Sequence, residues 1–168
     1  MTRPNLHSDS RVDVAIIGAG PAGQMLAAAL RKEGIRVCVV GPTDVWQKRW
    51  CVWADEVAST PLATCVAKRF DSLKVVVDDS QPALSLPDYQ EVDKEALRAQ
   101  TTLHSGADPG QGERVVGRVL AVDHSPSTST LFLDDARTLQ ADIVVDASGR
   151  ANPWVSRSGP TASAYQTA

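Results

Sequence analysis

One stretch near the N-terminus constrains the fold of this chain more than any other. An apolar run over residues 12–17 leads into the sequence Gly-Ala-Gly-Pro-Ala-Gly at 18–23, and a helical pattern continues over 25–30. A GxGxxG turn that follows a strand and opens a helix is far more specific than the bare motif. This order predicts a βα unit that holds the pyrophosphate of a dinucleotide.

The glycines of this turn have separate expected roles. Gly18 permits the tight turn, Gly20 lets the backbone approach a pyrophosphate, and Gly23 lets the helix pack closely on the strand. The free N–H groups and the positive dipole end of the helix would face the phosphates. The cofactor-binding residues predicted here are Gly18, Ala19, Gly20, Pro21, Ala22 and Gly23. The alternative is a glycine-rich turn of an α/β protein that binds no ligand.

Composition and charge narrow the class of protein. The 168 residues suit about one domain, and 43% hydrophobic residues suffice for a core. A net charge of −3 argues against a nucleic-acid partner. No apolar run approaches the roughly 20 residues of a membrane span, and no signal peptide is evident, so we expect a cytoplasmic protein. Cys38, Cys51 and Cys65 lack metal-ligand spacing and are expected to be reduced thiols, with no metal bound.

A second apolar strand is expected over residues 35–40, after Gly34 as the helix C-cap. In dinucleotide folds an Asp or Glu at the end of this strand accepts hydrogen bonds from the adenosine ribose. Here that position is Gly41, and Asp44 lies three residues further on. Asp44 is therefore the candidate ribose ligand, with a solvated loop residue as the alternative.

Three tryptophans cluster just beyond this strand. Trp46, Trp50 and Trp53 are spaced four and three residues apart, and Asp55 and Glu56 follow directly. On a helix, this spacing would place the three indoles on one face. Two interpretations stay open, an aromatic stripe in the core or an aromatic wall along a ligand cavity.

The remainder of the chain alternates loops with regular elements. Loops are expected over 78–88 and 105–112, and a helix over 92–103 with Asp93 near its start and Leu97 buried. Further expected elements are strands at 115–124 and 130–135, joined as a hairpin, and a buried strand at 143–145 followed by Asp146, Ala147, Ser148 and Gly149. Small residues at that strand end would allow close approach of a cofactor, which adds Asp146 and Gly149 to the predicted cofactor-binding set.

These elements predict an α/β fold, a Rossmann-like dinucleotide-binding domain. Its mostly parallel sheet is expected to combine strands near 12–17, 36–40, 114–117 and 141–146. A small antiparallel meander is expected near 118–134, and a partial substrate-facing insertion at 42–111.

With these residues placed, the chain resembles the N-terminal part of the lycopene cyclase family, within the glutathione-reductase-like flavoproteins. The whole flavoprotein group shares DVAIIGAGPAG at 13–23, whereas WCVWADEV at 50–57 is similar to the cyclase signature Tyr-Gly-x-Trp-x-Asp-Glu. Trp50 and Cys51 replace its Tyr-Gly, and Gly41 stands where the family usually has an acidic residue. Weaker similarity covers 37–42, 89–100, 141–150 and 160–168.

This resemblance implies an FAD-dependent isomerase that acts on a linear carotenoid such as lycopene. In that family a proton adds to a terminal alkene, a carbocation forms, the ring closes and a proton leaves, with no net redox change. The implied cofactors are FAD in its reduced form and NAD(P)H as the reductant. The full-length family also implies peripheral contact with a membrane.

The resemblance also assigns roles to particular residues. Asp55 and Glu56 would be catalytic, orienting the substrate or shuttling protons, although a general acid would need its pKa raised by burial. A solvated acidic turn is the alternative for this pair. Trp50 and Trp53 would line the polyene tunnel, where cation–π attraction favours a carbocation.

Two rival interpretations accompany this assignment. One is a redox flavoprotein, such as a monooxygenase or halogenase, and the other is a non-catalytic, truncated dinucleotide-binding fragment. The expected organisation is a disordered tail at 1–11, a Rossmann-like FAD/NAD(P)-binding domain at 12–150, and the start of a truncated remainder at 151–168.

Overall fold

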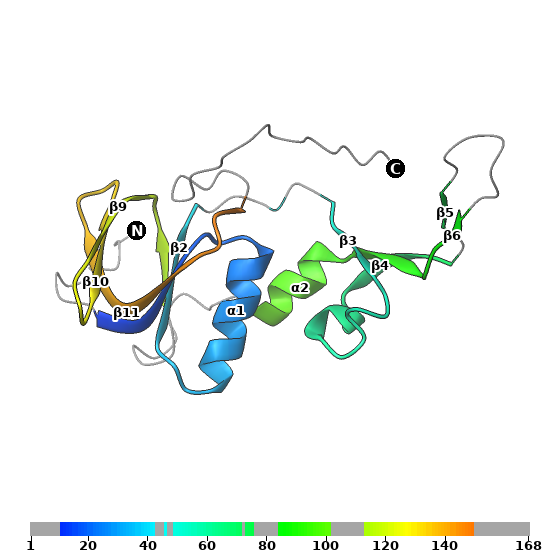
Figure 1. The fold of residues 1–168 in the computed structure, drawn as a ribbon, viewed down its shortest axis with the longest axis horizontal. Helices are drawn as coiled ribbons and strands as arrows, with labels where there is room; N and C mark the ends of the chain where they lie inside the picture. The colour runs from blue at the N-terminus through cyan, green and yellow to red at the C-terminus, as the bar shows by residue number, and fades with distance from the viewer. Residues whose placement is uncertain are drawn as a thin grey trace.

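A computed structural model describes residues 11–42, 46, 49–71, 73–75, 84–101 and 113–149. Its main sheet has six strands in the order β8-β2-β1-β11-β10-β9 (Figure 1). The strands of this sheet are β1 Arg11–Ile17, β2 Val37–Gly41, β8 Glu113–Val116, β9 Val119–His124, β10 Ser129–Leu133 and β11 Thr138–Asp146. Helix α1 Pro21–Lys32 lies beside this sheet, and helix α2 Lys94–Thr101 packs against α1.

The pairing of the strands confirms the expected α/β class. Strands β8, β2, β1 and β11 pair in parallel, whereas β9 and β10 add to β11 as an antiparallel meander. In register, Ile17 lies opposite both Val40 of β2 and Asp146 of β11. The carboxyl ends of the three central strands therefore meet where the glycine turn begins, which is where such sheets place their ligands.

A second, smaller sheet follows β2 in the chain, within the predicted insertion. It has the order β3-β7-β4 and is accompanied by a short 3₁₀ helix, η1. The bounds of these elements are β3 Cys51–Trp53, η1 Pro61–Thr64, β4 Val66–Phe70 and β7 Tyr89–Val92. A two-stranded ribbon pairs β5 Lys74–Val75 with β6 Leu84–Ser85. Figure 1 shows α2 between this sheet and α1.

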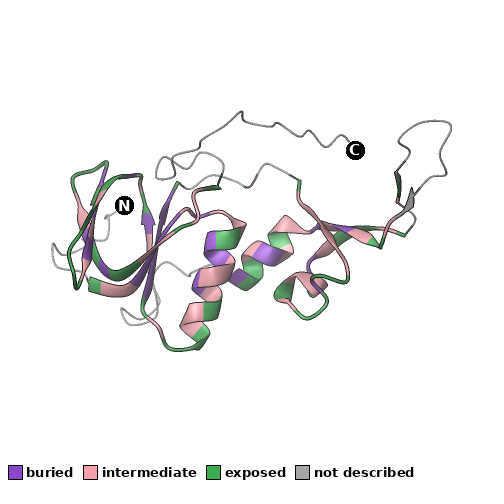
Figure 2. Cartoon of the chain, in the orientation of Figure 1, coloured by how far each residue is buried: buried purple, intermediate pink, exposed green. Residues whose placement is uncertain are grey.

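The alternation of side chains along β1 and β2 divides the main core in two. Ala15 and Ile17 face the meander, in a cluster that includes Leu131 and Leu139. On the opposite face, alternate residues such as Ile16 pack under α1. Figure 2 shows buried residues on the strands and on the inner side of α1. Cys38 and Cys65 lie in buried clusters, Cys51 is half-buried, and no disulfide joins these three described cysteines.

The residues at the two ends of helix α1 act as the sequence predicts, although the helix starts four residues before the expected range. Pro21 occupies the first helical turn, where its missing N–H is not needed. Gly34 follows the helix with φ of 76°, and the Ile35 N–H donates to the Leu30 carbonyl at 3.2 Å. This Schellman arrangement requires the left-handed conformation that glycine adopts without strain.

Four expected features differ from the structure. The three tryptophans do not share one face of a helix, because residues 51–53 form β3 and pair antiparallel with β7. The strand expected over 115–124 breaks at Gly117, where the chain turns from parallel β8 to antiparallel β9. Two residues of the expected 78–88 loop form β6, and Arg11, assigned to the tail, begins β1. For the tryptophan segment, pairing with β7 far along the chain overrides the local pattern.

The alternation of buried and exposed side chains along β10 of the meander can be tested by substitution. Leu131 is fully buried, whereas the next residue, Phe132, is 41% exposed on the opposite face of β10. We expect Leu131→Ala to lower the free energy of unfolding by about 2–5 kcal/mol, because it leaves a cavity. Phe132→Ala is the matched control and should lose less than about 1 kcal/mol. Equal losses in urea unfolding would contradict this alternation.

Candidate functional site

The glycine turn lies tightly against its neighbours on two sides. Gly18 has φ of 117°, and a Cβ there would overlap the Ala147 carbonyl at the end of β11. A Cβ on Gly23 would overlap the Gly18 carbonyl and lie 3.3 Å from the Ile16 side chain. Glycine at these positions therefore allows α1 to start directly on β1 and beside β11.

Gly20 is not crowded in this way, because a Cβ there would have no atom of the described residues within 4 Å. It is the N-cap of α1, and no side chain within the described ranges caps the first turn. The N–H groups at the start of α1 are therefore left for an anionic ligand, with the helix dipole adding to the attraction. This open space beside a helix N-terminus fits a pyrophosphate group.

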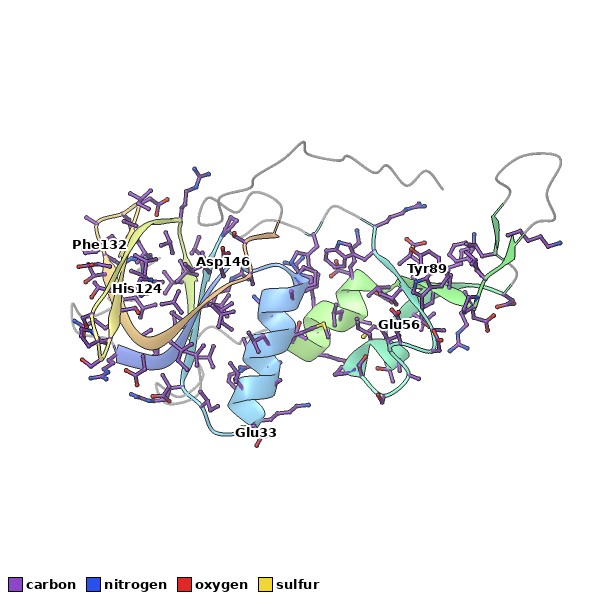
Figure 3. The ribbon with its side chains drawn as sticks, viewed as in Figure 1. Glu33, Glu56, Tyr89, His124, Phe132 and Asp146 are labelled. Atoms are coloured by element: carbon purple, nitrogen blue, oxygen red, sulfur yellow. The ribbon has the colours of Figure 1, made fainter. Side chains whose placement is uncertain are left out.

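The end of β11 forms the adjoining wall of this space. The Ala147 N–H donates to the Ile17 carbonyl at 2.8 Å, and the Ser148 N–H donates to Asp146 Oδ1 at 2.8 Å. The buried Ser148 Oγ has no hydrogen-bond partner among the described residues. Figure 3 shows Asp146 beside the start of α1. Asp146 thus stabilises the turn that precedes Gly149, whose φ is 73°.

Trp46 holds the glycine turn from the other side. Its Nε1–H donates to the Ala19 carbonyl at 3.1 Å. Lys94 in turn donates to the Trp46 carbonyl at 2.9 Å, and the Arg98 guanidinium lies 5.3 Å from the Trp46 ring centre. Because N–H and C=O point in opposite directions across a trans peptide, this bond orients the Gly20 N–H away from Trp46.

An apolar cavity of about 360 Å³ adjoins the start of α1. It lies between α1, α2, η1 and the second sheet, and all of its lining residues are apolar. They are Pro21, Ala22, Met25, Trp50, Val52, Leu62, Val92 and Leu97. Pro21 and Ala22 belong to the first turn of α1, so the cavity adjoins the same helical turn that Gly20 precedes.

The two tryptophans predicted to line a substrate tunnel separate in the structure. Trp50 lines the cavity and contacts Trp46, with ring centres 5.2 Å apart. Trp53 does not line the cavity, because it lies on the opposite face of β3 from Val52 and packs on Tyr89 of β7, with ring centres 4.6 Å apart.

The predicted acidic pair lies away from this cavity. Asp55 and Glu56 are exposed in the turn after β3, where Asp55 Oδ1 accepts the Glu56 N–H at 3.0 Å. Figure 3 shows Glu56 on the side of the second sheet, near Tyr89. The structure therefore joins the glycine turn, Asp146 and Trp50, but not the acidic pair. Asp44 lies outside the described residues.

The fold and the glycine turn together define a Rossmann-type dinucleotide-binding domain, a fold that solved FAD-dependent proteins share. A probable FAD-dependent monooxygenase from Pseudomonas aeruginosa matches with a TM-score of 0.63 and 20% identity, over 84% of this chain and 43% of that one. A peptidyl tryptophan dihydroxylase matches with a TM-score of 0.58 and 26% identity, over 88% of this chain and 34% of that one. These matches therefore support the alternative of a redox flavoprotein only at the level of the fold.

Within this class, the family model described as lycopene cyclase protein matches residues 13–168, and the chain belongs to that family. A chloroplastic lycopene beta cyclase of an Oncidium hybrid cultivar is 30% identical over all of this chain and 36% of its own length. A chloroplastic neoxanthin synthase of Solanum lycopersicum is 30% identical over 95% of this chain and 32% of its own length. The chain spans about a third of the length of these relatives.

Two glycine variants separate folding from ligand binding. Gly20→Ala places a methyl group in open space at a φ of −72°, so we expect the melting temperature to be retained. The same methyl group should reduce FAD affinity by about tenfold or more, because it occupies the space for the pyrophosphate.

Gly23→Ala is the matched variant and should instead lower the free energy of unfolding by about 1–3 kcal/mol or more. Thermal unfolding and FAD titration measure both effects. A Gly20→Ala protein that binds FAD normally would place the pyrophosphate elsewhere.

Trp46→Phe tests the hydrogen bond that orients the turn. The phenyl ring keeps an aromatic side chain but cannot donate to the Ala19 carbonyl. We expect FAD affinity to fall by about three- to tenfold, equivalent to about 0.5–1.5 kcal/mol. Trp53→Phe, which changes a ring that contacts Tyr89, is the control and should leave the affinity unchanged. Equal affinities of the two variants would rule out this role for Trp46.

Proposed function

We propose that this chain forms the FAD-binding part of a carotenoid cyclase that acts on a linear polyene such as lycopene. The observation that carries the proposal is the position of the apolar cavity. Its lining includes Pro21 and Ala22 of the same helical turn whose N–H groups suit a pyrophosphate. A hydrocarbon end group in this cavity would therefore lie close to the cofactor, as membership of the lycopene cyclase family leads one to expect.

The residues of the turn and of the β11 end would hold the cofactor. Gly20 offers open space and the start of α1 offers N–H donors, while Ser148 Oγ offers a buried polar group. In its reduced form, maintained by NAD(P)H, FAD would supply negative charge that stabilises a developing carbocation.

Trp50 and its apolar neighbours would bind the end of the polyene and exclude water from it. Water exclusion protects a carbocation from capture before the ring closes. An indole face adds cation–π attraction, worth about 2 kcal/mol when desolvated. Trp50 is the tryptophan of the predicted pair that suits this role, because it lines the cavity.

Asp55 and Glu56 remain the proposed proton-handling pair. Their exposed turn follows β3 directly, so they can exchange protons with water close to the second sheet. A role as proton shuttle rather than as buried acid suits this exposure. Asp55→Asn and Glu56→Gln should then slow cyclisation without changing FAD affinity.

Peripheral contact of a cytoplasmic protein with a membrane completes the proposal. A long polyene partitions into a bilayer because of the hydrophobic effect, so its enzyme must reach the membrane surface. The names of the relatives assign those proteins to chloroplasts or chromoplasts. In the described ranges, no helix combines the length and the apolar content of a membrane span.

The test is binding of FAD and of detergent-dispersed lycopene to the purified chain. We expect one FAD per chain, a higher melting temperature with FAD, and retention of lycopene on gel filtration. Trp50→Leu should weaken lycopene retention, and Trp53→Leu is the matched control that should not.

Three results would separate the alternatives. FAD binding without lycopene retention would favour a dinucleotide-binding module with no cyclase substrate site. Loss of retention in the Trp53 variant alone would place the polyene against the second sheet rather than in the cavity. Absence of FAD binding would overturn the proposal.

A further inference from the structure

The residue at the end of β2, where the ribose of a dinucleotide is expected to bind, is unusual in this chain. A carboxylate commonly stands there and accepts hydrogen bonds from the adenosine ribose. In this chain the position is Gly41, and a Cβ there would lie 2.6 Å from the Ala19 nitrogen and 2.8 Å from the Ala19 Cβ. An acidic side chain at position 41 would therefore displace the glycine turn, so ribose recognition needs another group.

An arginine from the neighbouring strand reaches this place. Arg114 lies in β8 opposite Val39 of β2, and its Nη2 donates to the Pro42 carbonyl at 2.9 Å. Pro42 directly follows Gly41, so this bond fixes the guanidinium beside the end of β2. The buried Arg114 Nε has no hydrogen-bond partner among the described residues. A buried donor without a partner is unfavourable, and a ligand oxygen would satisfy it.

The charges around Arg114 also favour an anionic partner. Burial and then the nearby charge of Arg98 lower the pKa of the Arg114 guanidinium. No carboxylate forms an ion pair with Arg114 in the described part of the chain. Because an arginine stays protonated at neutral pH, an oxygen acceptor from a ligand would offset this repulsion.

We propose that Arg114 recognises the ribose of the bound dinucleotide by donating to an oxygen at its 2′ position. This inference rests on the proposed dinucleotide site, and it reverses the direction of the usual hydrogen bond. A carboxylate accepts from the ribose hydroxyl and repels a 2′-phosphate, whereas a guanidinium accommodates one. The adenosine end of this site therefore gains affinity from a 2′-phosphate instead of losing it.

Asp44 offers the opposite expectation, because it is the acidic residue nearest in sequence to the end of β2. A ribose held by Asp44 would be bound less tightly after 2′-phosphorylation, through repulsion of like charges. The sign of the effect of a 2′-phosphate thus decides between the two residues.

The experiment compares 5′-AMP with adenosine 2′,5′-bisphosphate as competitors for FAD on the full 168-residue chain. We expect the bisphosphate to bind about tenfold more tightly, as for a charge-assisted hydrogen bond. Arg114→Gln should abolish this difference, and it should also weaken AMP binding by about three- to tenfold, because AMP loses the hydrogen bond to its 2′ oxygen. Arg114→Lys should restore part of the difference, and Asp44→Asn should leave it unchanged.

Arg69→Gln is the matched control for net charge, because Arg69 is an exposed arginine of β4. It should preserve the preference, and thermal unfolding checks that each variant folds. Equal or weaker binding of the bisphosphate overturns the inference, as does a preference that survives in Arg114→Gln.

The inference and the proposed function fail in different ways. FAD binding and lycopene retention without a 2′-phosphate preference overturn only the role of Arg114. A preference that depends on Arg114 in a chain that retains no lycopene supports the inference and leaves the cyclase proposal unsupported. Failure of the chain to bind any adenine nucleotide overturns both.

Discussion

The close contact of the glycine turn with the surrounding strands is the constraint on which the rest of the structure depends. Three glycines allow this close contact. Gly18 packs against Ala147, Gly23 packs against Gly18, and Gly41 packs against Ala19. A side chain at any of them would push the start of α1 away from the sheet. The open space at Gly20 and the apolar cavity share that first helical turn, so their common position follows from these missing side chains.

The elements that could be predicted from sequence are those whose determinants are local. Strand β1, the turn, α1 and its Schellman end lie within about 25 consecutive residues, and each carries its own signal, whether apolar alternation, glycine spacing or Gly34. Helix α2 was similarly predictable, because Asp93 Oδ1 accepts the Ala96 N–H at 3.0 Å as an N-cap. Buried β2 and β11 needed only short apolar runs.

The parts that could not be predicted depend on partners far away in the chain. The Trp46 side chain donates a hydrogen bond to the Ala19 carbonyl, and the Trp46 carbonyl accepts one from Lys94. Nothing in the spacing of the tryptophans indicates either contact. The helical spacing suggested one aromatic face, yet pairing of β3 with β7 sends Trp53 to Tyr89. The sequence carries no signal for Arg114 either, because only the pairing of β8 with β2 brings it to Pro42.

The position of the Trp46–Trp50 pair has an optical consequence. These two indoles lie between the glycine turn and the apolar cavity, with ring centres 5.2 Å apart. Flavins and polyenes both absorb at wavelengths where indoles emit, so either molecule bound here would quench their fluorescence by energy transfer. The chain therefore carries an intrinsic fluorescent reporter, and its emission would register occupancy on each side of the first turn of α1 without any added label.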